Sequence, residues 1–254
     1  MACFMAEKYS LIYTLLIIYK HVTYHLKKMK YFTFHIDDSG AIEDIDYKKV
    51  NGQNITICKM YDDDEFNKLN DILHSINEFI LNEKALNILK GSKTIQYDLR
   101  KAKVLRKEKL FGILKKNKSY DYFDLTFPDK YANECYNWID FEKSEIFATD
   151  SNGEKFKIKS HQHKLDLISE NKSDSKTNYS FETKKVFFGK NFDFEIDFFK
   201  IPLYSSGEYV SERFKNKMEK EKITDIRFAE RKEQLNKIWQ PMFPIIEFDN
   251  KNGR

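Results

Sequence analysis

The sequence predicts an α+β fold, with a mixed and mostly antiparallel sheet and two or three helices packed against it. The 254-residue chain contains 22 Phe and 15 Tyr, and aromatic side chains suit the half-buried surface of a sheet. Several short segments alternate apolar and polar residues, as strands do. Other segments combine a capping residue with apolar residues at helical spacing.

The length and composition indicate one globular domain. With 41% apolar and 33% charged residues, the chain is typical of a folded protein and not of a disordered one. We assign residues 29–254 to a single domain. The alternative is a division into two lobes, 29–118 and 119–254, that meet near Lys118–Tyr120.

Residues 1–28 differ from the rest of the chain. Tyr9–Tyr19 is an uncharged apolar run of eleven residues, whereas a membrane-spanning helix needs about 20. Met29 opens a segment that is typical of a protein start. We therefore interpret residues 1–28 as an upstream extension or an apolar helix. Because lysines flank the run, an interfacial membrane helix is the alternative, which fractionation against a chain starting at Met29 would test.

Two hairpins are predicted from turn chemistry. Asn51-Gly52 separates Ile45–Val50 from Gln53–Met60, and this pair tolerates the positive φ angles of a type I′ turn. The segment 150–153 (DSNG) separates Ser144–Thr149 from Lys155–Lys159 in the same way. Further strands or extended segments are expected at Tyr31–Ile36, Ile95–Leu99, Tyr120–Phe127, Tyr136–Phe141, Val186–Phe188, Phe192–Phe199, Ile226–Phe228 and Trp239–Phe248.

Three helices are predicted from start signals. Asp62–Glu65 precedes apolar residues at helical spacing over Phe66–Ile80, and acidic residues favour the first turn of a helix. Asn82 caps a second helix that stops at Gly91. Ser211 caps a third helix, with Glu212 in its first turn and Phe214 and Met218 on the buried side.

An acidic strand face is the first candidate site. If Phe192–Phe199 is a strand, its aromatic side chains point to one face, and Asp193, Glu195 and Asp197 point to the other. This stripe is either a solvated face or a surface that binds a basic partner. A metal site would need further ligands, because alternate residues on one strand face lie about 6–7 Å apart.

The sequence lacks the common catalytic and metal-binding motifs. His161 and His163 fall on one face of a predicted strand, but no third zinc ligand has a suitable spacing. Asp62–Glu65 is interpreted as a helix start and not as a metal site. Cys3, Cys58 and Cys135 are far apart, which indicates isolated thiols in a reducing cytoplasm. We therefore predict a protein without enzymatic activity, metal or cofactor.

The basic stretch Arg100–Lys118 leaves nucleic-acid binding or processing as an alternative function. Four Lys against one Glu give residues 1–28 a charge of +3, which leaves +1 of the total +4 for residues 29–254. That balance, and the scarcity of stacking side chains in the stretch, argue against nucleic acid as the main partner.

Five segments between Tyr120 and Phe228 carry a resemblance to a bacterial family. The segments are Tyr122–Leu125, Ile139–Ser144, Phe198–Ile201, Val210–Phe214 and Ile223–Phe228. Together they resemble the polymorphic-toxin immunity proteins, in particular immunity family eleven, and family forty-three is similar. Leu81–Leu89 fits an earlier helix of that family. The resemblance leads us to expect a glycine between the last helix and the last strand, where this chain has Asp225.

This resemblance implies a non-enzymatic, cytoplasmic antidote that binds one cognate toxin and covers its active site. Such an interface typically buries about 1,600 Å² in total. If the toxin is a basic nuclease, the acidic stripe would mimic phosphates and speed association. We expect the partner-binding residues to be Asp193, Glu195, Asp197, Asp140, Glu142, Ser211, Glu212 and Arg213.

Overall fold

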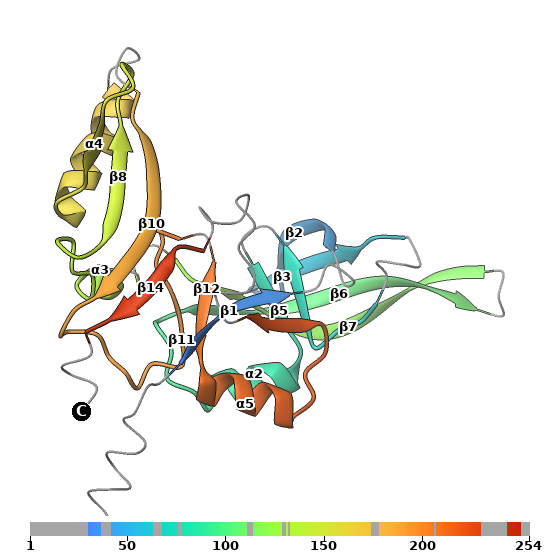
Figure 1. Cartoon of the computed structure of the whole chain (residues 1–254). Helices are drawn as coiled ribbons and strands as arrows, with labels where there is room; N and C mark the ends of the chain where they lie inside the picture. The colour runs from blue at the N-terminus through green and yellow to red at the C-terminus, as the bar shows by residue number, and fades with distance from the viewer. Residues whose placement is uncertain are drawn as a thin grey trace, which may run out of the picture.

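A computed structural model shows the architecture of the chain (Figure 1). The described residues contain 14 strands and 4 helices, which confirms the predicted α+β class. The interpretations of residues 1–28 lie outside the described residues. The structure describes residues 30–36, 42–62, 68–75, 78–110, 114–128, 131, 133–173, 178–205, 207–229 and 243–249.

Sheet A is fully antiparallel and joins the start of the described chain to its C-terminal part. Its central strand β1 pairs with β12 on one side and with β13 on the other. The predicted strands at Tyr31–Ile36 and near Ile226–Phe228 are confirmed. In spatial order sheet A contains β11 (Phe198–Lys200), β12 (Glu208–Ser211), β1 (Tyr31–Ile36) and β13 (Ile226–Ala229).

Sheet B is mixed, because β3 and β6 pair in parallel while its other neighbours are antiparallel. The turn between β2 and β3 has φ angles of 50° at Asn51 and 80° at Gly52, which confirms the predicted hairpin. In spatial order sheet B contains β2 (Ile42–Val50), β3 (Gln53–Met60), β6 (Asp98–Leu110), β7 (Leu114–Thr126), β5 (Glu78–Leu81) and β4 (Ile72–Ser75).

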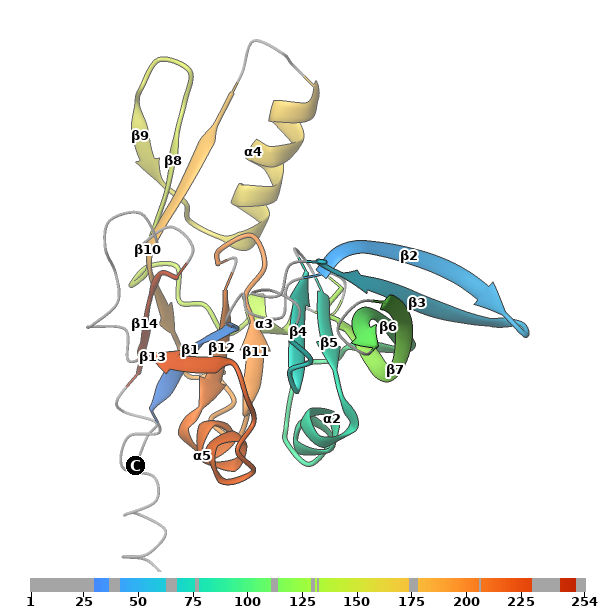
Figure 2. The same ribbon diagram turned by 90° about the vertical axis from the view of Figure 1, so that its right-hand side faces the viewer.

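The strands β8 and β9 of sheet C lie with the helix α4 in the upper part of Figure 2, whereas β14 lies lower, near sheet A. The β8–β9 hairpin turns at Gly153, which has a φ of 84°, so the second predicted hairpin is confirmed. In spatial order sheet C contains β14 (Ile245–Phe248), β10 (Ser180–Phe188), β8 (Glu145–Thr149) and β9 (Lys155–Lys157), and α4 covers His161–Ser173.

The helices α2 (Glu83–Lys90) and α5 (Glu212–Lys220) lie side by side below sheets A and B (Figure 2). The Asn82 side chain accepts a hydrogen bond from the backbone of Ala85, and Ser211 does the same for Phe214. Both predicted N-caps are therefore confirmed. At the start of α2, Lys84 Nζ donates to the carbonyl of Lys222, just after the end of α5, so the helices run antiparallel.

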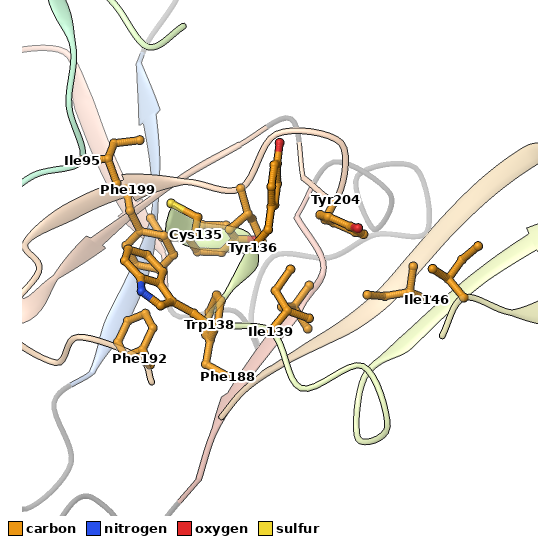
Figure 3. Packing of buried hydrophobic residues seen from close by; sticks show 14 of the residues in the cluster. Ile95, Cys135, Tyr136, Trp138, Ile139, Ile146, Phe188, Phe192, Phe199 and Tyr204 are labelled. Carbon is orange, nitrogen blue, oxygen red and sulfur yellow. The ribbon is translucent and has the colours of Figure 1, made fainter. Parts of the chain in front are cut away.

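The buried apolar side chains of the described residues form three clusters. The first lies between sheets A and C and is dominated by aromatic rings, including Trp138, Phe188 and Phe199 (Figure 3). The second lies between sheet A, part of sheet B and the helices α2 and α5. The third covers the other face of sheet B and includes Cys58. Cys58 and Cys135 are buried, and neither forms a disulfide.

The predicted helix over Phe66–Ile80 is wrong where the structure describes it. Residues 72–75 and 78–81 form the antiparallel strands β4 and β5 instead. Ile72 and Phe79 pack in the second cluster, whereas Leu73 and Ile80 pack in the third. When both faces of a strand are buried, apolar residues follow one another without strict alternation, and their spacing resembles that of a helix.

Two further strand predictions are also wrong. The segment predicted as a strand at Tyr136–Phe141 follows the short helix α3 (Asn133–Tyr136) as consecutive turns. His161 opens α4, so His161 and His163 lie on a helix and not on a strand. The Ser160 side chain accepts a hydrogen bond from the backbone of His163, so a serine cap starts this helix.

The basic stretch Arg100–Lys118 lies in a long hairpin. β6 and β7 pair over their whole lengths, from Asp98–Thr126 to Leu110–Leu114. The predicted strand over Ile95–Leu99 begins only at Asp98. Because β7 runs without interruption through Lys118–Tyr120, the hypothetical boundary between two lobes falls inside a strand.

Asp225 has a φ of 59° at the position where the resemblance leads us to expect glycine. A left-handed conformation costs an L-residue about 1–2 kcal/mol, and glycine avoids this cost. We expect Asp225→Gly to be more stable than Asp225→Ala by about 1 kcal/mol in urea denaturation. Equal stabilities of the two variants would contradict a left-handed backbone at this position.

Candidate functional site

The segment predicted as an acidic strand is mostly a pair of turns. The backbone N–H of Phe192 donates to Gly189, and that of Ile196 donates to Asp193. The Asp193 carboxylate also accepts a hydrogen bond from the backbone of Glu195 at 2.9 Å. Only residues 198–200 are a strand, so the predicted stripe of Asp193, Glu195 and Asp197 on one strand face is wrong. Aspartate favours such turns because its side chain bonds to the backbone two residues later.

Asp197 is a buried hydrogen-bonding centre. Its side chain is 6% exposed. One carboxylate oxygen accepts hydrogen bonds from Ser211 Oγ at 2.5 Å and from Arg213 Nε at 3.0 Å. The other oxygen accepts a hydrogen bond from the backbone N–H of Lys93 at 3.2 Å. Asp197 therefore joins three segments that are distant in the sequence.

Lys93 forms ion pairs with the other two acidic residues of this segment. Its ammonium group lies 2.7 Å from Asp193 and 3.3 Å from Glu195. Partial burial alone would raise the pKa of Asp193, but the hydrogen bonds from Lys93 and from the Glu195 backbone lower it below the usual value. The same contact with Asp193 raises the pKa of Lys93. These charges partly cancel at the surface.

The start of α5 presents Arg213 in a fixed orientation. Its Nε donates to Asp197, and its terminal nitrogen donates to the Glu195 carbonyl at 2.6 Å. The side chain nevertheless remains 48% exposed. Glu212 is exposed beside it, whereas Ser211 is buried under the first turn. Arg213 can therefore bind an external carboxylate or carbonyl without first losing the entropy of a free side chain.

Asp140 and Glu142 are not part of the group around Asp197. They lie in the turns between α3 and β8. The Asp140 carboxylate accepts hydrogen bonds from the backbones of Glu142 and Lys143. Lys143 also forms ion pairs with Asp140 and Asp249. Thus the structure brings together five of the eight predicted residues, namely Asp193, Glu195, Asp197, Ser211 and Arg213, with Glu212 adjacent to them.

A second polar group, around Lys164 on α4, is absent from the sequence-based predictions. Lys164 donates a hydrogen bond to the Leu203 carbonyl and lies 4.3 Å from the centre of the Tyr204 ring. His161, one turn earlier, contacts the Tyr204 hydroxyl at 3.0 Å. Ser160 as a helix cap is the sequence signal that would have predicted α4, whose buried residues include Lys164 and Leu167.

Burial gives Lys164 a measurable effect on stability. It lowers the pKa of this amine from 10.5 to about 8. Between these values the unfolded chain binds more protons than the folded chain, so stability rises with pH. At pH 7 the Lys164 amine is charged in the folded protein, so the burial of this charge lowers the stability in full. Above pH 10.5 the amine is neutral in both the folded and the unfolded chain, and this cost disappears.

We expect the stability difference between Lys164→Met and the natural chain to shift by up to about 3 kcal/mol between pH 7 and pH 10.5. The variant gains relative stability at the lower pH, where it avoids the buried charge. Urea denaturation at both pH values measures this difference, and Lys172→Met on the exposed side of α4 is the control. A difference that does not depend on pH would contradict the lowered pKa.

Within the described ranges, no cluster of three or more His, Cys, Asp or Glu residues has a metal-binding arrangement. His163 turns away from His161 and bonds to the backbone of Lys159. Among the helices of the described part, none is long and apolar enough to cross a membrane.

The chain was compared with known protein families, with curated proteins and with solved structures. No protein family matches it. No curated protein and no solved structure gives a significant match either.

Proposed function

We propose that this protein is a cytoplasmic bacterial immunity protein that binds a cognate toxin domain and covers its active site without catalysing a reaction. The proposal rests on the resemblance of the segments between Tyr120 and Phe228 to the polymorphic-toxin immunity proteins. The antidote role is what that resemblance implies.

One observation carries the proposal. The resemblance leads us to expect a glycine between the last helix and the last strand, and Asp225 at that position has the left-handed φ of 59° that glycine favours. The neighbouring segments of the resemblance also pack together. Phe198–Ile201 contributes β11, Val210–Phe214 starts α5 and Ile223–Phe228 leads into β13. This supports a shared local architecture behind the short sequence similarities.

The face around the start of α5 is our candidate toxin-binding surface. Arg213 is the residue type most often found, with Trp and Tyr, at the energetic centre of protein interfaces. Its orientation is fixed by Asp197, and the Glu195 side chain beside it is 79% exposed. Because Asp197 is buried and Asp193 is paired with Lys93, we withdraw the idea of a phosphate-like acidic stripe.

Co-expression tests the antidote role. The toxin domain encoded next to this gene would be induced in bacteria with and without this protein. Survival only in the presence of the protein, together with co-purification of the two chains, would support the proposal. Continued killing at equal expression levels, or a neighbouring gene without any toxic product, would overturn it.

A matched pair of variants tests the surface. Glu212→Lys changes the charge in the first turn of α5, and Glu83→Lys makes the same change in the first turn of α2. Both lose a similar favourable interaction with the helix dipole. Because α2 and α5 are antiparallel, the two positions lie at opposite ends of the helix pair. We expect only Glu212→Lys to weaken toxin binding.

The β6–β7 hairpin favours nucleic-acid binding as a second candidate function. Residues 106–118 contain six Lys or Arg and only one Glu. The pairing of β6 with β3 ends at Leu105, so this part projects as a two-stranded ribbon (Figure 1). The major groove of DNA is wide enough to admit such a ribbon.

Salt dependence separates the second candidate from the first. Binding of duplex DNA through the ribbon would weaken steeply with salt, and the double variant Lys116→Glu, Lys118→Glu would flatten that dependence. Lys48→Glu, Lys49→Glu at the exposed end of β2 is the control with the same charge change. The absence of salt-sensitive binding to DNA or RNA would exclude this function.

A further inference from the structure

Lys164 is a buried cation whose charge is only partly compensated. The residue is 2% exposed, and its ammonium group donates one hydrogen bond, to the Leu203 carbonyl. The rings of Tyr204 and Phe181 lie 4.3 and 5.0 Å away. Among the described residues, no carboxylate forms an ion pair with Lys164. Buried charges in proteins are normally paired, so this site favours an external anion.

An open pocket of about 370 Å³ lies beside this ammonium group. It is formed by three parts of the chain: the first turn of α4, the middle of β10 and the segment after β11. Its size is that of a typical small-molecule site. The lining residues are Lys164, Phe181, Thr183, Lys200, Pro202, Leu203, Tyr204 and Ser205.

The other charged groups around the pocket leave the positive charge of Lys164 in place. Lys200 pairs with Glu208 at 3.2 Å, and burial raises the pKa of that glutamate. His161 reaches the pocket only through the Tyr204 hydroxyl, and burial lowers the pKa of its imidazole. At neutral pH the surroundings of Lys164 are therefore neutral or positive.

Part of the pocket lining is apolar. Phe181, Pro202 and Leu203 belong to it. Leu203 has a φ of 67° and an exposed side chain at the rim. A ligand that satisfies both features of the pocket would carry an anionic group and an apolar body.

We propose that this pocket binds an amphipathic anion, whose carboxylate or phosphate group pairs with Lys164 and whose apolar body lies against Phe181, Pro202 and Leu203. The inference does not depend on toxin binding, because the pocket is formed by α4, β10 and the segment around the end of β11, and not by the start of α5. A neighbouring opposite charge favours the protonated amine, so the ligand would make Lys164 less nucleophilic.

Competitive acetylation with acetic anhydride tests the proposal on the natural chain. Peptide mass spectrometry resolves Lys164 from Lys172, which is exposed on the same helix and serves as an internal reference. The probes are benzoate, phenyl phosphate and the uncharged benzyl alcohol, at equal ionic strength and pH 8. We expect benzoate or phenyl phosphate at saturation to slow acetylation of Lys164, relative to Lys172, by at least about fivefold.

The three probes distinguish the outcomes. Slowing by benzoate alone or by phenyl phosphate alone would support the proposal and identify the preferred anionic group. No slowing by either anion would overturn it. If benzyl alcohol slowed the acetylation of Lys164 equally, the proposal would also be overturned. The ligand would then act by blocking access to the amine and not by its charge. As an independent check, an anion-induced rise in Tm should disappear in Lys164→Met and persist in Lys172→Met.

Discussion

We expect Asp197→Ala to lower the free energy of unfolding by about 3–4 kcal/mol. The substitution removes the acceptor for the buried Ser211 hydroxyl and for the partly buried Lys93 N–H, and a buried donor left without a partner costs about 1–3 kcal/mol. It also removes the partner of Arg213 at the start of α5. Urea denaturation at pH 7 measures the loss, provided that the m-value is unchanged.

Two further variants define the origin of this loss. Asp197→Asn retains one acceptor oxygen and should lose less stability than Asp197→Ala. Glu195→Gln removes an exposed partner of Lys93 and should leave stability unchanged within error, because exposed ion pairs contribute little. If Asp197→Ala and Glu195→Gln had similar effects, the buried centre assigned to Asp197 would not exist.

The elements that the sequence predicted correctly depend on local chemistry. Asn51-Gly52 and Gly153 adopt the positive φ angles that their turns require. Asn82 and Ser211 bond to the backbone three residues later, as helix caps do. In each case the residues that determine the structure are neighbours in the chain, so no knowledge of the rest of the fold was needed.

The elements that were missed depend on distant partners. Ile72 and Leu73 form a strand because the two faces of β4 meet two different clusters, which the spacing of apolar residues does not reveal. The length of β6 and β7 is likewise set by their mutual pairing over 13 residues each. The sequence shows that this stretch is basic, but it does not show which strand the stretch pairs with.

The candidate site was predicted in its residues but not in its geometry. Alternation in Phe192–Phe199 predicted a strand, whereas the Asp193 side chain bonds to the backbone of Glu195 and forms a turn. The turn buries Asp197, which then contacts Ser211, 14 residues later. A pattern of polar and apolar residues cannot distinguish a solvated carboxylate from one that is buried with its hydrogen-bond donors.

We expect Phe199→Ala to destabilise the protein by about 3–5 kcal/mol, the usual cost of removing a buried phenylalanine. Phe199 is 0% exposed and belongs to the aromatic cluster in Figure 3, with its ring centre 5.7 Å from that of Phe188 and 5.6 Å from that of Phe192. Its ring also stacks on Tyr209 of β12 at 5.4 Å. The substitution would leave a cavity where sheets A and C meet.

A peripheral phenylalanine provides the comparison. Phe156 on β9 is only partly buried at the edge of the same cluster, so Phe156→Ala should cost clearly less than Phe199→Ala, because less area and a smaller cavity are involved. Urea denaturation measures both losses, and near-ultraviolet circular dichroism reports on the aromatic packing. Equal losses for the two variants would contradict the deeper burial of Phe199.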